Sequence, residues 1–89
     1  MEENEIGERV LGCALCVHRA LGPGLLESAY ETCLAHELTK AGLDFDRQLM
    51  LPVTYDGLII DAGYRLDLLV CGRVVIEIKA VEKLGRVVI

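Results

Sequence analysis

The hydrophobic period changes at Phe45, and this change constrains the fold more than any other feature of the sequence. Before Phe45, apolar residues recur every three or four positions, a spacing that is typical of amphipathic helices. After it, apolar and polar residues alternate, which is typical of strands with one buried face. The sequence therefore predicts an α/β (α+β) domain in the order α-α-β-β-β, with a mainly antiparallel sheet of three to four strands.

Two helices are expected before the change of period. The first has Asn4 as its N-cap and must stop at the helix-breaking run LGPG, residues 21–24. The second begins near Leu25 and is stopped by Gly42. The apolar stripe of the first helix is Ile6, Val10, Cys13, Ala14, Val17 and Leu21, and that of the second is Leu26, Tyr30, Cys33, Leu34, Leu38 and Ala41.

Three strands are expected after it. Pro52 marks the first strand, which starts at Phe45, as an edge strand or a bulged one. The dipeptide Asp56-Gly57 predicts a two-residue hairpin turn. A second strand then runs from Leu58 to Val70, with a break at Ala62-Gly63 as one alternative, and a third covers residues 73–80.

Charged residues follow a regular pattern in the last two strands. Side chains alternate between the two faces of a sheet, so a matched phase gives one wholly apolar face. That face would hold Leu66, Leu68, Val70, Val74, Ile76 and Ile78. The opposite face would hold the charged residues Arg65, Asp67, Glu77 and Lys79, together with Leu69 and Val75.

The loop between these strands decides whether the phase matches. A two-residue loop at Cys71-Gly72 would place Asp67 and Glu77 on opposite faces. A three-residue loop centred on Gly72 pairs Val70 with Val74 and Asp67 with Glu77. A register slip of one residue turns every side chain over, so the apolar pattern predicts the odd-length loop, with Gly72 in a conformation suited to glycine.

In that register two carboxylates lie opposite each other, with Cβ atoms about 4.5–5.5 Å apart. Like charges so close repel unless a cation lies between them. One interpretation is a divalent ion, since hard cations take several oxygen ligands. The other is a solvated face on which Arg65 and Lys79 neutralise the pair, and the pattern alone slightly favours this second interpretation.

Three blocks of sequence resemble a known family. They are GLLESAY at residues 24–30, GYRLDLLV at residues 63–70 and EIKAVE at residues 77–82. Together they resemble the GxxExxY proteins, a branch of the PD-(D/E)XK nuclease superfamily, over residues 4–84. The resemblance implies part of a restriction-endonuclease-like core. Members of that family continue beyond the third block, so a single but incomplete domain over residues 1–89, truncated at its carboxyl end, is expected.

The resemblance also implies roles for individual residues. Asp67, Glu77 and Lys79 would be catalytic, and Glu27, Asp67 and Glu77 would bind Mg²⁺ or Mn²⁺, helped by the carbonyl group of Ile78. Lys79 would position the attacking water or neutralise the scissile phosphate. The supporting residues would be Gly24, Tyr30 and Arg65, although Tyr30 also lies on the apolar stripe of its helix and packs in the core on the simpler interpretation.

The expected function is therefore that of a metal-dependent nuclease acting on DNA or RNA. The net charge of −5 argues against binding nucleic acid through bulk electrostatics alone. The alternative is a catalytically inactive nuclease-fold remnant that acts as a dimerising or binding module. A hydrophobic content of 53% in so short a chain favours self-association, with a homodimer expected.

The location expected is cytoplasmic, without membrane insertion. The acidic first residues do not resemble a signal peptide, and no apolar run is long enough to span a bilayer. The four cysteines are expected to be reduced. Cys13-x-x-Cys16 and Cys33-x-x-His36 imitate a zinc spacing, but zinc is not expected, because structural zinc pairs usually sit on turns rather than on helices.

Overall fold

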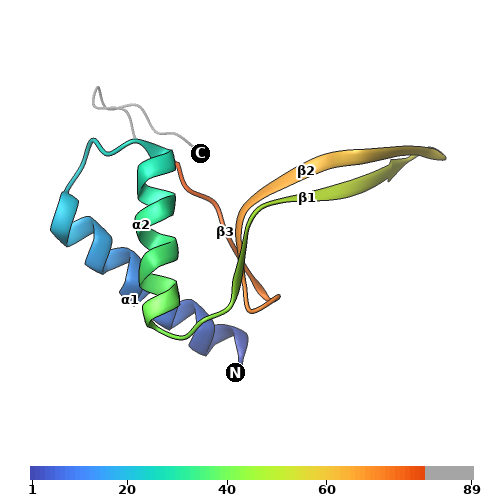
Figure 1. Cartoon of the computed structure of the whole chain (residues 1–89). Coiled ribbons are helices and arrows are strands. Elements are labelled where there is room, and N and C mark those ends of the chain that lie inside the picture. The colour runs from blue at the N-terminus through green and yellow to red at the C-terminus, as the bar shows by residue number, and fades with distance from the viewer. Residues whose placement is uncertain (80–89) are drawn as a thin grey trace.

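A computed structural model describes residues 1–79 and confirms the predicted order of elements (Figure 1). Two helices, α1 (Glu3–Leu21) and α2 (Glu27–Lys40), precede three strands. The strands β1 (Phe45–Tyr55), β2 (Leu58–Val70) and β3 (Val74–Ile76) form an antiparallel sheet in the order β1-β2-β3. The expected extension of the last strand to Ala80 reaches beyond the described residues, as does the segment 81–89.

The helix ends differ slightly from those predicted. The helix α1 begins at Glu3, with Glu2 at the cap, so Asn4 lies inside the first turn and is not the N-cap. Glu3 and Glu5 lie in that turn, where the helix dipole favours negative charge.

The helix α2 begins at Glu27 and ends as predicted before Gly42, which has φ of 76°. Gly42 N–H donates to the Thr39 carbonyl oxygen, and Leu43 N–H donates to that of Leu38, both at 3.0 Å. These are the two bonds of a Schellman cap.

The strands β1 and β2 form a long hairpin arm that extends away from the helices (Figure 1). Asp56 and Gly57 both have positive φ, 49° and 79°, and join paired Tyr55 and Leu58, which confirms the two-residue turn. The strand β1 is an edge strand, as Pro52 predicted. The register shifts opposite Pro52, and the extra residues of this bulge lie on β2, between Ile60 and Tyr64.

The strand β2 is continuous through Gly63, so the strand itself is not broken at Ala62-Gly63. Its pairing with β1 is interrupted there, however, because Tyr64 pairs with Leu51 and the next pair is Ile60 with Val53. A Cβ atom at Gly63 would lie 2.7 Å from Cβ of Val53. The glycine therefore allows β1 to approach β2 closely beside the irregularity, and it does not end the strand.

The loop between β2 and β3 has the predicted odd length. Val70 pairs with Val74, and Gly72 has φ of 65°, a conformation that glycine adopts readily. The ladder ends at the pair Leu68–Ile76, so β3 is shorter than the predicted strand.

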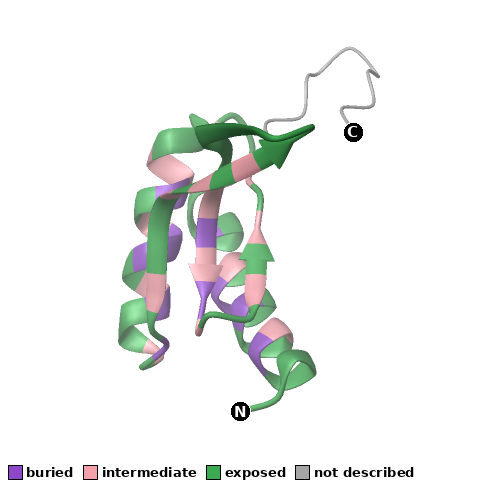
Figure 2. Cartoon of the chain, turned by 90° about the vertical axis from the view of Figure 1, so that its right-hand side faces the viewer, coloured by how far each residue is buried: buried purple, intermediate pink, exposed green. Residues whose placement is uncertain are grey.

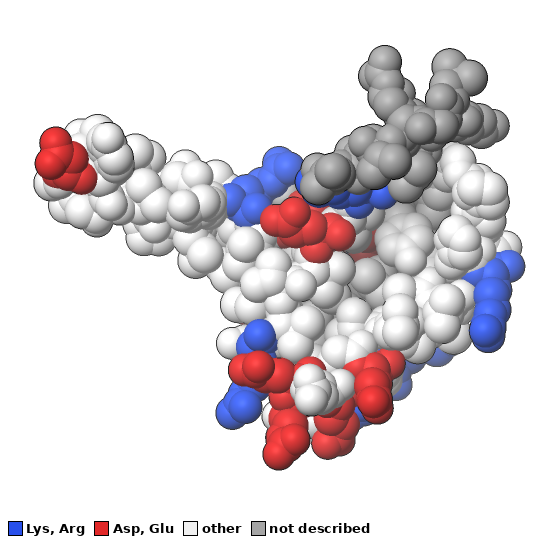
Figure 3. All heavy atoms as spheres, turned by 180° about the vertical axis from the view of Figure 1, so that it is seen from behind, with Lys and Arg blue, Asp and Glu red and all other residues white. Residues whose placement is uncertain are grey.

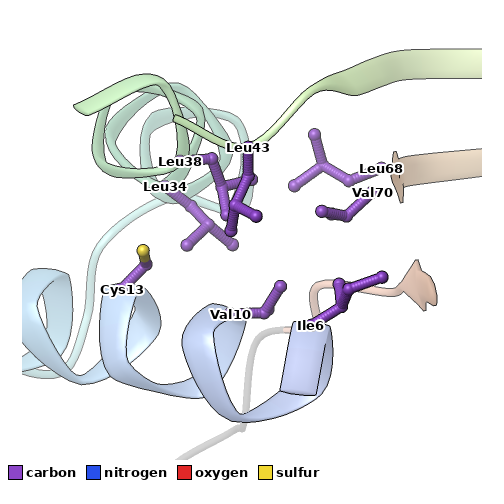
Figure 4. Close-up of a cluster of buried hydrophobic side chains, with 8 residues drawn as sticks. All are labelled: Ile6, Val10, Cys13, Leu34, Leu38, Leu43, Leu68 and Val70. Carbon is purple, nitrogen blue, oxygen red and sulfur yellow. The ribbon is translucent and has the colours of Figure 1, made fainter. Parts of the chain in front are cut away.

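The hydrophobic core lies where the helices meet the base of the arm (Figure 2, Figure 4). Leu68 and Val70 of β2 are fully buried there, and Val74, Ile76 and Ile78 pack against the same cluster. The predicted apolar face of the last two strands is therefore confirmed for these five residues, whereas the sixth, Leu66, is half-buried and lies outside the cluster. The buried cluster consists of Ile6, Val10, Cys13, Leu34, Leu38, Leu43, Leu68 and Val70.

Within residues 1–79, no helix has both the length and the apolar character needed to cross a bilayer.

Candidate metal centre

Asp67 is tied to the segment that follows β3. The backbone N–H of Ile78 donates a hydrogen bond of 2.9 Å to Oδ2 of Asp67. The sequence predicted that Asp67 pairs with Glu77 across the ladder, and this pair does not form. The Asp67 carboxylate takes over a backbone donor of the segment instead, and regular pairing stops one step earlier, at Ile76. The bond fixes the position of residues 77–79 relative to β2.

Asp67 faces a cleft of about 440 Å³ between α2 and the sheet. Glu27, at the first position of α2, lines the same cleft, as do Arg65 and Ile78. Glu27 is exposed and lies in the turn where the helix dipole favours a carboxylate. Three residues singled out from the sequence, Glu27, Arg65 and Asp67, thus line one cleft.

Glu77 and Lys79 line a second cleft of about 340 Å³, together with Glu27 and Ile78. A third cleft, of about 430 Å³, is lined by Gly24, Glu27 and Lys79. Glu27 belongs to all three clefts, and Ile78 to the first two. Among these three clefts of residues 1–79, Asp67 lines the first and Glu77 lines the second, and Ile78 lines both.

The oxygen donors around the first cleft suit Mg²⁺ or Mn²⁺ better than a soft metal. In the described part of the chain, no three His, Cys, Asp or Glu side chains are close enough together to hold a metal ion. A complete cage of side chains is not required, because Mg²⁺ commonly binds one or two carboxylates and keeps several waters. The single hydrogen bond to Oδ2 also leaves lone pairs of Asp67 available.

Tyr30 serves the packing of the two helices. Its hydroxyl group donates a hydrogen bond of 3.1 Å to the carbonyl oxygen of Ala14 in α1 and does not reach a carboxylate. Burial raises the pKa of Tyr30 above its ordinary value of 10.0. The ring also lines the clefts that contain Glu77 and Lys79, so it shapes the edge of the site.

The structure adds a cluster that the sequence interpretation missed. Glu31 is only 7% exposed and accepts hydrogen bonds from Arg47 at 2.9 Å and 3.3 Å and from Gln48 at 2.6 Å. Glu31 and Gln48 line the cleft that contains Asp67. The available signal was the spacing of Glu27 and Glu31, because residues four apart share one helix face. The partners of Glu31 are distant in sequence and leave no local signal.

The residues of the zinc-like spacing are divided between two places. Cys13 is in the hydrophobic core, whereas Cys16, Cys33 and His36 line a groove between the helices. All four cysteines are free thiols. Burial raises the pKa of Cys13 above its ordinary value of 9.0, and the negative charge of Glu37 raises it further. The raised pKa favours the protonated thiol over the metal-binding thiolate.

Charged side chains of both signs gather where the arm joins the body, while most of the arm surface in this view is uncharged (Figure 3). Arg65 and Asp67 come from adjacent positions on one face of β2 at this junction. The candidate site is therefore a mixed-charge surface, although the whole chain carries a net charge of −5.

Comparison with known proteins gives one match. A family model described as the PD-(D/E)XK nuclease superfamily matches residues 4–88. Neither the curated proteins nor the solved structures contain a significant match to the chain.

Proposed function

The chain belongs to the PD-(D/E)XK nuclease superfamily, and on that premise we propose that it is a metal-dependent nuclease that hydrolyses phosphodiester bonds. One observation carries the proposal. Asp67 lines a cleft with Glu27 and also binds the backbone of the segment that contains Glu77 and Lys79. Family membership makes a nuclease-like function the natural expectation, and this arrangement supports the particular reaction.

The proposed division of roles follows from chemistry. Asp67 and Glu77, with the carbonyl oxygen of Ile78, would hold Mg²⁺ or Mn²⁺, and Glu27 would contribute through water. When bound, the ion lowers the pKa of a bound water and offsets charge that develops on the phosphate. The ammonium group of Lys79 would hold the attacking water or offset the charge of the scissile phosphate.

A nucleic-acid substrate, DNA or RNA, is part of the proposal. The net charge of −5 opposes binding to a polyanion, so the site must supply attraction locally. Arg65 in the cleft and Lys79 beside it supply positive charge, and a divalent ion offsets the carboxylates. We expect binding that depends strongly on the divalent ion as well as on salt.

A cleavage assay tests this function. Purified protein is incubated with labelled single-stranded DNA, double-stranded DNA and RNA in Mg²⁺, in Mn²⁺ and in chelator. We expect cleavage in at least one metal, none in chelator, and a loss of at least about 100-fold in Lys79→Ala, since positioning and charge stabilisation of this kind contribute that much. Cleavage by Lys79→Ala at the wild-type rate would contradict the assigned role.

A second candidate function, a non-catalytic module that self-associates, is favoured by the surface of the arm. Tyr55 and Ile59 are 72% and 71% exposed, and Leu58 is 60% exposed. Exposed apolar groups gathered at the end of a projecting hairpin are typical of interaction surfaces. Sedimentation at several concentrations is expected to show a homodimer that Ile59→Thr weakens, and a monomer at all concentrations would contradict self-association.

The cytoplasmic location expected from the sequence stays a prediction.

A further inference from the structure

Gln48 has an unusual backbone conformation in the middle of β1. Its φ is 51°, although the residues on both sides belong to the strand. The ladder pairs Arg47 with Leu68 and Leu49 with Leu66, and Gln48 and Asp67 are the residues between these pairs. A left-handed conformation is strained for a non-glycine residue, so surrounding contacts must hold it.

The contact that holds it is a hydrogen bond to α2. Nε2 of Gln48 donates to Oε1 of Glu31 at 2.6 Å. The other oxygen of Glu31, Oε2, accepts from Nη2 of Arg47 at 2.9 Å and from Nε at 3.3 Å. Both oxygens of this buried carboxylate are therefore occupied by donors from two consecutive residues of β1.

This arrangement fixes the orientation of the Gln48 amide. A carboxylate paired with a guanidinium group accepts hydrogen bonds and donates none. The amide must therefore direct its NH₂ group to Glu31, and its carbonyl oxygen must point the other way. Within residues 1–79 this oxygen accepts no hydrogen bond from the protein, and Gln48 lines the cleft that contains Asp67.

We infer that Gln48 is a positioning residue of the metal centre, whose side-chain carbonyl oxygen accepts a hydrogen bond from a water on the divalent ion held by Asp67. The inference rests on the proposed metal-dependent function. A small divalent ion keeps several waters, and these are strong donors that need acceptors of fixed position. Gln48 supplies one such acceptor, and Glu31 and Arg47 set its direction.

The simpler account is that Gln48 only fastens β1 to α2, and Glu31→Gln separates the two accounts. In this variant the new amide would turn its oxygen to Arg47 and its NH₂ group to residue 48. Gln48 would then accept that bond through its own oxygen and present NH₂ to the cleft. The number of bonds between β1 and α2 would be kept, but the acceptor in the cleft would become a donor.

The experiment measures Mn²⁺ affinity by calorimetry and by the loss of the free-ion paramagnetic resonance signal. Glu31→Gln is expected to weaken binding by about 10-fold or more, in line with outer-shell residues of metal sites. Gln48→Gly, which removes the acceptor and relieves the positive φ, is expected to weaken it similarly while keeping the fold. This second variant keeps the test valid if Glu31→Gln does not fold.

Thr32→Val is the matched control, because Thr32 accepts a bond of 3.1 Å from Nη2 of Arg47 but does not contact the amide. Its Mn²⁺ affinity is expected to equal that of the wild type. Wild-type affinity in folded Gln48→Gly, or equal weakening in Thr32→Val, would overturn the positioning role alone. If the wild-type chain binds no Mn²⁺, or if Asp67→Asn binds it equally well, the metal centre and this inference fail together.

Discussion

Oδ2 of Asp67 accepts a hydrogen bond of 2.9 Å from the backbone N–H of Ile78, so one carboxylate both ends the β2–β3 ladder and fixes the segment that contains Glu77 and Lys79. The site is joined to the fold at this point. A change at Asp67 should therefore affect stability as well as chemistry, and the two effects can be separated.

Asp67→Ala is expected to lower the free energy of unfolding by about 1–2 kcal/mol, because it leaves the half-buried N–H of Ile78 without an acceptor. Asp67→Asn keeps a carbonyl oxygen for that N–H, so its loss is expected to be below about 0.5–1 kcal/mol. Urea unfolding of both variants measures the difference. Equal losses in the two variants would contradict the assigned hydrogen bond.

Removal of Glu31 should destabilise the chain far more than removal of a surface ion pair. Glu31→Ala is expected to lower the free energy of unfolding by about 1–3 kcal/mol. This is less than the loss expected when a fully buried ion pair is broken, because the Arg47 side chain is 40% exposed. The control is Lys40→Ala, which breaks the exposed pair with Glu37 and should cost at most about 0.5 kcal/mol. Urea unfolding is again suitable, and similar losses would refute the structural role of Glu31.

Stability is expected to fall at high pH through Cys13 and Tyr30. Burial raises both pKa values in the folded state, above the ordinary values of 9.0 for Cys13 and 10.0 for Tyr30. The neutral forms therefore favour folding, and their contribution is complete below the unfolded-state pKa and is lost as pH rises through the folded-state pKa. The decline should begin near pH 9 for Cys13 and near pH 10 for Tyr30.

Denaturation between pH 7 and pH 11 tests this dependence. Tyr30→Phe loses the bond to Ala14, worth about 0.5–1.5 kcal/mol, and should flatten the part of the decline above pH 10. Cys13→Ala should flatten the earlier part. If stability falls with pH in both variants as it does in the wild type, groups other than Cys13 and Tyr30 cause the loss.

Two glycine-to-alanine changes should have opposite effects. At Gly63 the new Cβ would lie 2.7 Å from Cβ of Val53, so we expect a loss of about 1–3 kcal/mol from overpacking. At Gly12 in α1 nothing lies within 4 Å of the new Cβ, and the helix should gain about 0.5–1 kcal/mol. Thermal unfolding compares them, and a neutral Gly63→Ala would show that the two strands are not so closely opposed.

Much of the fold was predictable because it depends on local patterns. The change of period at Phe45 gave the order of elements, Asp56-Gly57 gave the hairpin turn, and the apolar phase of β2 and β3 gave the odd-length loop at Gly72. The N-cap of α1 was assigned wrongly to Asn4, because acidic residues in the first turn extend the helix to Glu3.

The site was less predictable, because its contacts join distant residues. The alternation of side chains placed Asp67 and Glu77 on one face but did not reveal that a backbone donor at Ile78 would compete for Asp67. Likewise, nothing in the local sequence links Glu31 to Gln48, or shows that Gln48 has positive φ. Such contacts follow from how α2 packs beside β1.

The most direct test of the metal centre is calorimetric titration of the full chain with Mn²⁺ and Mg²⁺, in parallel with Asp67→Asn and Glu77→Gln. We expect the wild-type chain to bind the ion, and each variant to bind at least about 10-fold more weakly because it removes one anionic oxygen ligand. Absence of binding to the wild type, or binding that survives both substitutions, would contradict the central claim that these two carboxylates hold a divalent ion.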